Sequence, residues 1–303
     1  MLTVREDHNP ESPNYVRGGP KIHFDLAGYD ILFWHPERLD EFRVELEKKI
    51  RRRLAVVVSP PAATVSPWNS EWLAAQHEVA SNGLSALGRK AFMEARFALD
   101  PPKPSRTQRE LDEAAREAPI DTFGWPIAVY LGNRDEFRPR PRADGIVAEV
   151  AIEDRSSYDY WAIRRDGDFY LLASLFEDMR DPTKIFFNTR IVRVTETLLY
   201  CARLYARLNV DPTATVNTAI KHGGLSGRSI GPSNPNRHIR PYVPASEDET
   251  EVELKTSLQD IESNLVSLVK QVVAPILVLF DFFEVGDSVY EDIVNNFVAG
   301  RVV

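Results

Sequence analysis

The sequence predicts an α+β protein, with an antiparallel sheet in the second half packed by helices, a helical N-terminal part and a long C-terminal helix. Two observations support this prediction. The runs 158–164 and 169–175 flank Asp166 and Gly167, a pair typical of a two-residue hairpin turn. Nearer the C-terminus, apolar residues from Leu254 to Val272 are spaced 4, 3, 4, 3, 4, which places them on one side of a helix. Strands and helices in separate parts of the chain favour the α+β class.

The first 100 residues are expected to form a mainly helical N-terminal region that begins with an extended arm. Residues 1–21 are rich in Pro, Asn and Gly and show no periodicity. A short buried strand is predicted at 30–34, and a helix then begins near Pro36, a residue favoured in the first helical turn. A second helical stretch is predicted over 69–99, where a group of prolines ends it.

Residues 101–122 are interpreted as a linker, and residues 123–303 as one α+β domain that ends in a long helix. The linker contains a short, highly charged helix over about 106–117. In the domain, the sequence predicts strands at 126–131, 145–152, 158–164, 169–175, 185–187, 213–220 and, at an edge, 239–243. It predicts helices at 188–208, 249–283 and 287–299.

Composition and charge exclude several classes of protein. The net charge of −8 argues against a protein that coats nucleic acid, although a local basic patch is compatible with it. The single cysteine, Cys201, allows no disulfide within the chain and fits a reducing compartment. Residues 1–20 lack the apolar core of a secretory signal, and the apolar stretch 272–283 is shorter than the roughly 20 residues of a membrane-spanning helix. We therefore expect a cytoplasmic protein with no membrane partner.

The regularly spaced apolar residues near the C-terminus predict a contact surface. Polar residues fill the positions between them, so the stripe needs cover either from the chain's own core or from a second copy. The first alternative is a long helix lying on its own sheet, and the second is a homo-oligomer. The stripe consists of Leu254, Leu258, Ile261, Leu265, Leu268 and Val272.

A basic, glycine-rich loop over 221–246 is the predicted ligand site. It contains no Asp or Glu inside an acidic protein. Glycines let backbone N–H groups converge, and neighbouring arginines add donors, so the loop could hold a nucleotide or the phosphates of a nucleic acid. The alternative is a solvated loop whose charge is balanced by the acidic run 247–253. The predicted ligand-binding residues are Lys221, His222, Gly223, Gly224, Gly227, Arg228, Arg237 and Arg240.

Two further patterns are compatible with nucleic-acid binding. Arg138, Arg140 and Arg142 alternate with prolines, which hold the three arginines apart in an extended array that could follow a phosphate backbone. Tyr158 and Tyr160 share one face of their predicted strand, where bases could stack on them. The alternatives are a solvated hairpin loop for the arginines and a packed core for the tyrosines.

The sequence contains no motif that fixes a reaction or a cofactor. The adjacent acids Glu177 and Asp178 follow a predicted strand, where catalytic loops often begin, but no third group is visible to tune them. The six histidines are scattered without the spacing of a zinc site, so no metal is expected. No serine lies in a G-x-S-x-G turn.

Residues 22–54 resemble the C-terminal end of bacterial TIR-like nucleotide-binding domains. The resemblance rests on the segment from His23-Phe24-Asp25 to Tyr29, similar to the family's PFD-x-x-x-Y motif, and on the helix after it. Such domains occur in signalling and defence proteins, and some degrade NAD. The parallel sheet that precedes this segment in the family has no counterpart here. The resemblance therefore implies at most the end of such a domain, without its NAD chemistry.

Residues 154–228 resemble the C-terminal region of bacterial proteins that carry Schlafen-like (AlbA-like) DNA-binding domains. The glycine-rich N-x-x-G-G core of the DNA-binding module itself is not present in this sequence. The matching residues are Tyr160, Trp161, Arg165, Asp166, Gly167, Leu171, Leu172, Glu196, Leu204, Tyr205, and His222 and Gly223 through Gly227 and Arg228.

Three hypotheses for the function follow. The first is a non-enzymatic, oligomerising regulatory or sensor module of a bacterial signalling or defence protein, which binds an anionic ligand or nucleic acid through the basic loop. The second is a nucleotide-processing enzyme that uses Glu177 or Asp178, and it requires these acids to meet the basic loop in one pocket. The third is a scaffold that binds only protein.

Overall fold

The computed structural model describes residues 2–9, 12–15, 17, 31–44, 46, 66–102, 105–122, 124–152, 157–234 and 243–301. The chain divides into two compact units, Met1–Val65 and Ser66–Val303. The expected linker at 101–122 is therefore wrong, because it lies inside the second unit. Strand β3 (Phe92–Asp100), which precedes it, pairs with strands on both sides in the middle of the large sheet.

The first unit contains a small parallel strand pair. Strand β1 (Leu2–Arg5) pairs with β2 (Ile31–Trp34), and a short 3-10 helix, Glu6–His8, follows β1. The guanidinium group of Arg5 lies 5.9 Å from the centre of the Trp34 ring. The predicted strand at 30–34 is confirmed, and residues 39–44 after it are helical. Most of the TIR-like segment lies outside the described residues.

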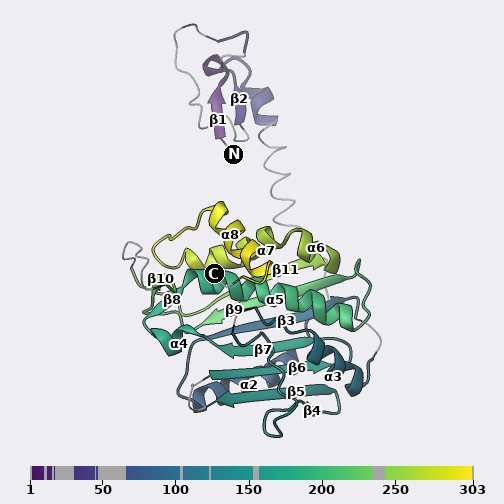
Figure 1. The fold of residues 1–303 in the computed structure, drawn as a ribbon. Coiled ribbons are helices and arrows are strands. Elements are labelled where there is room, and N and C mark those ends of the chain that lie inside the picture. The colour runs from purple at the N-terminus through teal and green to yellow at the C-terminus, as the bar shows by residue number, and fades with distance from the viewer. Residues whose placement is uncertain are drawn as a thin grey trace. The chain divides into compact units, whose positions relative to one another are not determined.

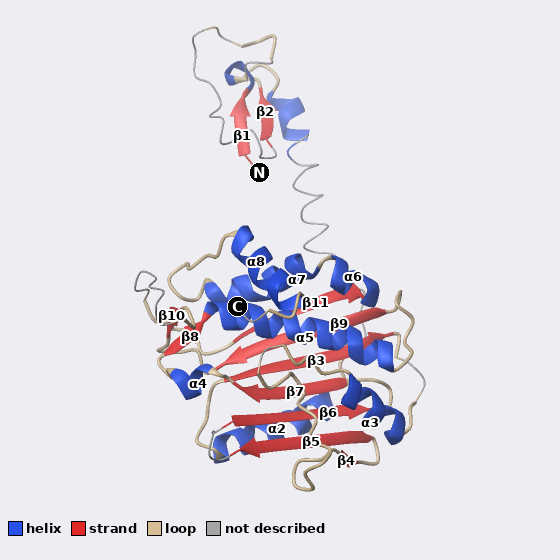
Figure 2. Ribbon diagram, viewed as in Figure 1, coloured by secondary structure: helices blue, strands red, loops and turns tan. Residues whose placement is uncertain are grey.

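The second unit is built on a seven-stranded sheet with the order β11-β9-β3-β7-β6-β5-β4, in which all neighbours are antiparallel (Figure 2). The antiparallel sheet and the α+β class are thus as predicted. A separate parallel pair joins β8 (Lys184–Phe186) to β10 (Ser229–Gly231). The other strands are β4 (Arg140–Pro141), β5 (Gly145–Ile152), β6 (Ser157–Arg164), β7 (Phe169–Ser174), β9 (Thr215–Gly223) and β11 (Thr250–Ser257).

The hairpin predicted around Asp166 and Gly167 is confirmed. Strands β6 and β7 pair from Asp159 opposite Ala173 to Ile163 opposite Phe169. Gly167 has a φ of 99°, a left-handed conformation that glycine adopts without steric cost. The alternation of side chains along β6 is also as expected. Tyr158 and Tyr160 pack with one apolar cluster and Trp161 with the other, on opposite faces of the sheet.

Helices cover both faces of the sheet (Figure 1). Helix α2 (Ser70–Ala86) packs on β6 and β7 on one face. On the other face, α5 (Phe187–Arg207) crosses the sheet and packs against α3 (Gln108–Glu117) and the C-terminal helices. Those helices are α6 (Leu258–Ser263), α7 (Leu265–Leu277) and α8 (Asp287–Val298), and the short α4 (Glu177–Arg180) precedes β8.

Two predicted elements in the first half of this unit are wrong. The helix expected over 69–99 is the helix α2 followed by the strand β3. Gly88, with a φ of 68°, lies between them, and Glu94 and Arg96 in β3 alternate with buried apolar residues as in a strand. The strand expected at 126–131 is a loop. Ala128 within it has a φ of 51°, which interrupts an extended backbone.

The single helix predicted over 249–283 is also wrong. Strand β11 occupies its first part, and α6 and α7 follow as separate helices. Strand β11 pairs along its whole length with β9, so Leu254 lies opposite Thr218. The spacing of apolar residues continues through the change from strand to helix, which is why it resembles one helix.

The apolar stripe is covered by the protein's own core. All six predicted oligomerisation residues are at most 9% exposed and belong to one apolar cluster with α5 and α8. The prediction that this stripe joins protomers is therefore wrong. None of the described helices combines the length and the hydrophobicity that a membrane-spanning segment requires.

Candidate functional site

The segment predicted as a basic loop, 221–246, includes the end of β9, the turn 224–228 and strand β10, and its described charged side chains are paired within the chain. Lys221 Nζ lies 2.6 Å from Glu249, and Arg228 Nη2 lies 2.6 Å from Asp178. His222 is fully buried, and burial, with Arg190 nearby, lowers its pKa well below the ordinary value. It is therefore a neutral residue of the interior. Arg237 and Arg240 lie outside the described residues.

The backbone donors of this loop also have partners. The N–H groups of Leu225 and Ser226 donate to the carbonyl and the carboxylate of Asp248, at 3.0 Å and 3.2 Å. The N–H group of Gly227 donates to the carbonyl of Ala245 at 2.9 Å. An anion would have to displace these hydrogen bonds, so these N–H groups of the loop are not available to bind it.

The glycines of the loop are explained by close packing. A Cβ atom on Gly224 would lie 2.5 Å from the Cα of Ala91, and one on Gly223 would lie 2.4 Å from the ring of Phe92. Both distances are shorter than carbon atoms tolerate. The start of β3 thus requires glycine at these two positions, whether or not a ligand binds.

Of the two acids in the enzyme hypothesis, Asp178 meets the basic loop at Arg228, whereas Glu177 pairs with Arg190 of α5, and both are buried. Glu177 is fully buried and accepts hydrogen bonds from Arg190 Nε at 2.9 Å and Nη2 at 2.7 Å. It also accepts one from the backbone N–H of Phe186 at 3.1 Å. Both carboxylate oxygens are thus occupied, and Asp178 is paired with Arg228. This geometry stabilises the junction between α4, α5 and the loop.

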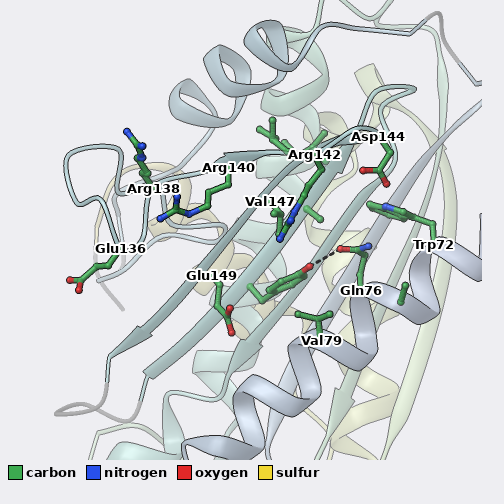
Figure 3. Close-up of a pocket in the computed structure, with 15 residues that line it drawn as sticks. Trp72, Gln76, Val79, Glu136, Arg138, Arg140, Arg142, Asp144, Val147 and Glu149 are labelled. Carbon is green, nitrogen blue, oxygen red and sulfur yellow. Dashed lines mark hydrogen bonds between the residues drawn. The ribbon is translucent and has the colours of Figure 1, made fainter.

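A groove on the α2 face of the sheet brings together the arginines of the second basic pattern (Figure 3). We call it the arginine groove. Its volume is about 480 Å³, and it lies between α2 and the strands β4, β5 and β6. The polar and aromatic residues that line it are Trp72, Gln76, Glu136, Arg138, Arg140, Arg142, Asp144, Glu149 and Tyr160.

The three arginines enter the groove from one continuous, proline-spaced segment. Figure 3 shows Arg142 extending over the middle of the groove and Arg138 and Arg140 at one end. Arg138 lies 3.5 Å from the Asp135 carboxylate, and Arg140 donates to the Asp135 carbonyl at 2.9 Å. Among the described residues, neither Arg140 nor Arg142 has a carboxylate within 4.0 Å. Both are exposed, so their charges face solvent.

Aromatic side chains form the floor and one wall of the groove. Tyr160 is 4% exposed, and its hydroxyl donates to Gln76 Oε1 at 2.6 Å. Burial raises the pKa of Tyr160 to about 12, so the hydroxyl remains a donor and fixes the Gln76 amide. Trp72 of α2 is partly exposed on the opposite side. The groove thus combines cationic and aromatic groups.

Three carboxylates also line the groove, and they limit where an anion can lie. Glu149 accepts a hydrogen bond from the Tyr158 hydroxyl at 2.9 Å, which holds it on the sheet away from Arg142 (Figure 3). Glu136 lies at the outer end and Asp144 beyond Arg142. An anionic group therefore fits between Arg140 and Arg142 better than elsewhere in the groove.

The sequence identifies the arginines of this groove but not its other wall. Trp72, Gln76 and Val79 recur at helical spacing on α2, which is the only local signal. Their position across from β5 depends on which face of the sheet α2 covers. Contacts between segments far apart in the sequence determine that face.

Comparisons with known proteins do not identify a family. No protein-family model matches the chain, and no significant match was found among curated proteins or solved structures. The two resemblances in the sequence therefore stay predictions. Within the described part of the chain, no group of three or more His, Cys, Asp or Glu side chains is placed to hold a metal ion.

Proposed function

We propose that the second unit is a binding module that takes a single-stranded nucleic acid in the arginine groove. The observation that supports this most is the pair Arg140 and Arg142, which lack carboxylate partners among the described residues and line the same groove as Trp72 and Tyr160. Basic groups that track a phosphate backbone, next to aromatic rings on which bases stack, are the two parts of a single-strand site.

In this proposal, phosphates lie on the guanidinium groups of Arg140 and Arg142, and one base stacks on Trp72. The proline-spaced segment holds the arginines before binding, which reduces the entropy lost on association. Because most of the affinity is electrostatic, binding weakens with salt, with a log–log slope of about 0.7 for each phosphate neutralised on a single strand. A sensor role in bacterial signalling or defence is a proposal that rests on the two sequence resemblances alone.

Fluorescence anisotropy with a labelled oligothymidine of about 12 nucleotides, at about 50 and 200 mM salt, tests the proposal. Replacing both arginines, Arg140→Gln with Arg142→Gln, should weaken binding about tenfold and lower the salt slope by about 0.7 for each arginine. Trp72→Ala should weaken binding without changing the salt slope, because stacking carries no charge.

The matched control is Arg301→Gln with Arg109→Gln, which removes the same charge from exposed positions that do not line the groove. This control should bind as the parent protein does. If the control and the groove variant lose equal affinity, binding depends only on net charge and the proposed site is wrong. A parent protein that does not bind the oligonucleotide at low salt would also end the proposal.

The enzyme hypothesis has less support. A catalytic carboxylate needs access to its substrate and a free oxygen, whereas Glu177 is fully buried and bonded at both oxygens. No observation on the described residues favours a reaction at this position.

A further inference from the structure

A second pocket, which we call the Asp159 pocket, opens on the α5 face of the sheet. Its volume is about 390 Å³, within the range of about 300–1,000 Å³ typical of small-molecule sites. It lies where β6 and β7 approach α4 and the first turns of α5. Its walls are mainly apolar and include Trp125, Ile127, Leu175, Phe176 and Met179. It is separate from the arginine groove, because Asp159 and Tyr160 are adjacent on β6 and face opposite sides.

Asp159 places a carboxyl group with an unused oxygen in this pocket. The residue is 9% exposed, and Oδ1 has no hydrogen-bond partner among the described residues. The backbone N–H of Val129 hydrogen-bonds the carboxyl group. A buried polar atom without a partner destabilises the protein, so a ligand that supplies a donor to Oδ1 removes this cost.

The two arginines of the pocket are already neutralised. Arg190 is paired with Glu177 at 2.7 Å, and Arg193 with Glu196 at 2.7 Å. Arg193 also donates to the Trp125 carbonyl at 2.8 Å. Because these pairs cancel, an ionised Asp159 leaves one uncompensated negative charge in an apolar environment.

We propose that the Asp159 pocket binds a small, mainly aromatic molecule that carries one protonated nitrogen, with that nitrogen donating to Asp159 Oδ1. A cation supplies the missing donor and also neutralises the carboxylate that forms when Asp159 loses its proton. The rings of Trp125 and Phe176 add apolar contact and attract a cation over their faces. A carboxylate or phosphate ligand would instead meet Asp159 with both arginines already paired, so the geometry disfavours anions here.

The protonation state of Asp159 gives this proposal a measurable consequence, the release of a proton when the ligand binds. Burial raises the pKa of Asp159 to about 8, an effect that Arg193 opposes and Glu196 reinforces. Tyr200 of α5 is a further titratable group beside it, and its pKa is raised by burial and by Asp159. At neutral pH the empty pocket therefore holds a protonated carboxyl. A cationic ligand displaces that proton to the solvent and pairs with the carboxylate.

Isothermal titration calorimetry on the full chain with benzamidine, benzamide and benzoate tests this inference. These probes share one shape and carry a positive charge, no charge and a negative charge. Benzamidine should bind at least about tenfold more tightly than the other two, which corresponds to about 1.4 kcal/mol. Repeating the titration at pH 7 in buffers of different ionisation enthalpy should show close to one proton released for each benzamidine bound.

The variant Asp159→Asn, which keeps the shape of the side chain, should lose the preference for benzamidine and the proton release. The matched control is Asp168→Asn, which changes a partly buried carboxyl at the opposite end of β7 and should leave both unchanged. Benzamide binding as tightly as benzamidine, or benzamidine binding without proton release, would overturn the inference. The proton measurement needs no variant, so the inference stays testable if Asp159→Asn fails to fold. Neither result depends on the oligonucleotide assay.

Discussion

At the scale of single residues, the buried pair of Glu177 and Arg190 should matter more for stability than any exposed ion pair. Arg190→Met leaves the Glu177 carboxylate buried without its partner, which should lower the free energy of unfolding by about 3–5 kcal/mol. The double variant with Glu177→Leu should recover much of this loss, because no buried charge remains. Chemical denaturation measures both values.

The control for this pair is Arg109→Met. Arg109 is 89% exposed and pairs with Glu113 one turn along α3, so its loss should cost at most about 0.5 kcal/mol. If Arg190→Met and Arg109→Met lower the free energy of unfolding equally, the charge of Glu177 is not buried as in the structure.

At the scale of elements, substitutions in α6 test whether the apolar stripe packs inside the protomer or joins two protomers. Ile261 is fully buried within the protomer, so Ile261→Asp buries an unpaired charge. It should destabilise the fold by more than about 4 kcal/mol. Gln259→Asp, on the exposed side of the same helix, should change stability by less than about 0.5 kcal/mol. Thermal unfolding combined with light scattering distinguishes the roles, because a folded Ile261→Asp protein that merely dissociates would restore the assembly role.

How much of the fold the sequence predicts depends on how local each signal is. The β6–β7 hairpin is predictable because Asp166 and Gly167 fix its turn within two residues. Strand β11 is not, since its apolar spacing at Leu254 and Leu258 runs unchanged into α6, and only pairing with β9 makes it a strand. Among the sites, the arginine array is local and visible. The partly exposed Trp72 and the unpaired oxygen of Asp159 belong to sites that form only when elements far apart in the sequence pack together, so no local pattern reveals them.

At the scale of the whole molecule, the division after Val65 predicts that the second unit folds by itself. Both apolar clusters of the described chain consist only of residues after that point, and the sheet they pack on is complete without the first unit. A fragment of residues 66–303 should therefore unfold cooperatively within about 3 °C of the corresponding transition of the full chain. It should also keep the oligonucleotide affinity, because the arginine groove is lined only by residues of this unit.

Calorimetry on the fragment measures its unfolding transition, and anisotropy measures its oligonucleotide affinity. The same fragment carrying Arg140→Gln and Arg142→Gln is the binding control. A fragment that is unfolded would show that the first unit completes the core, and a folded fragment without affinity would move the nucleic-acid site to the first unit.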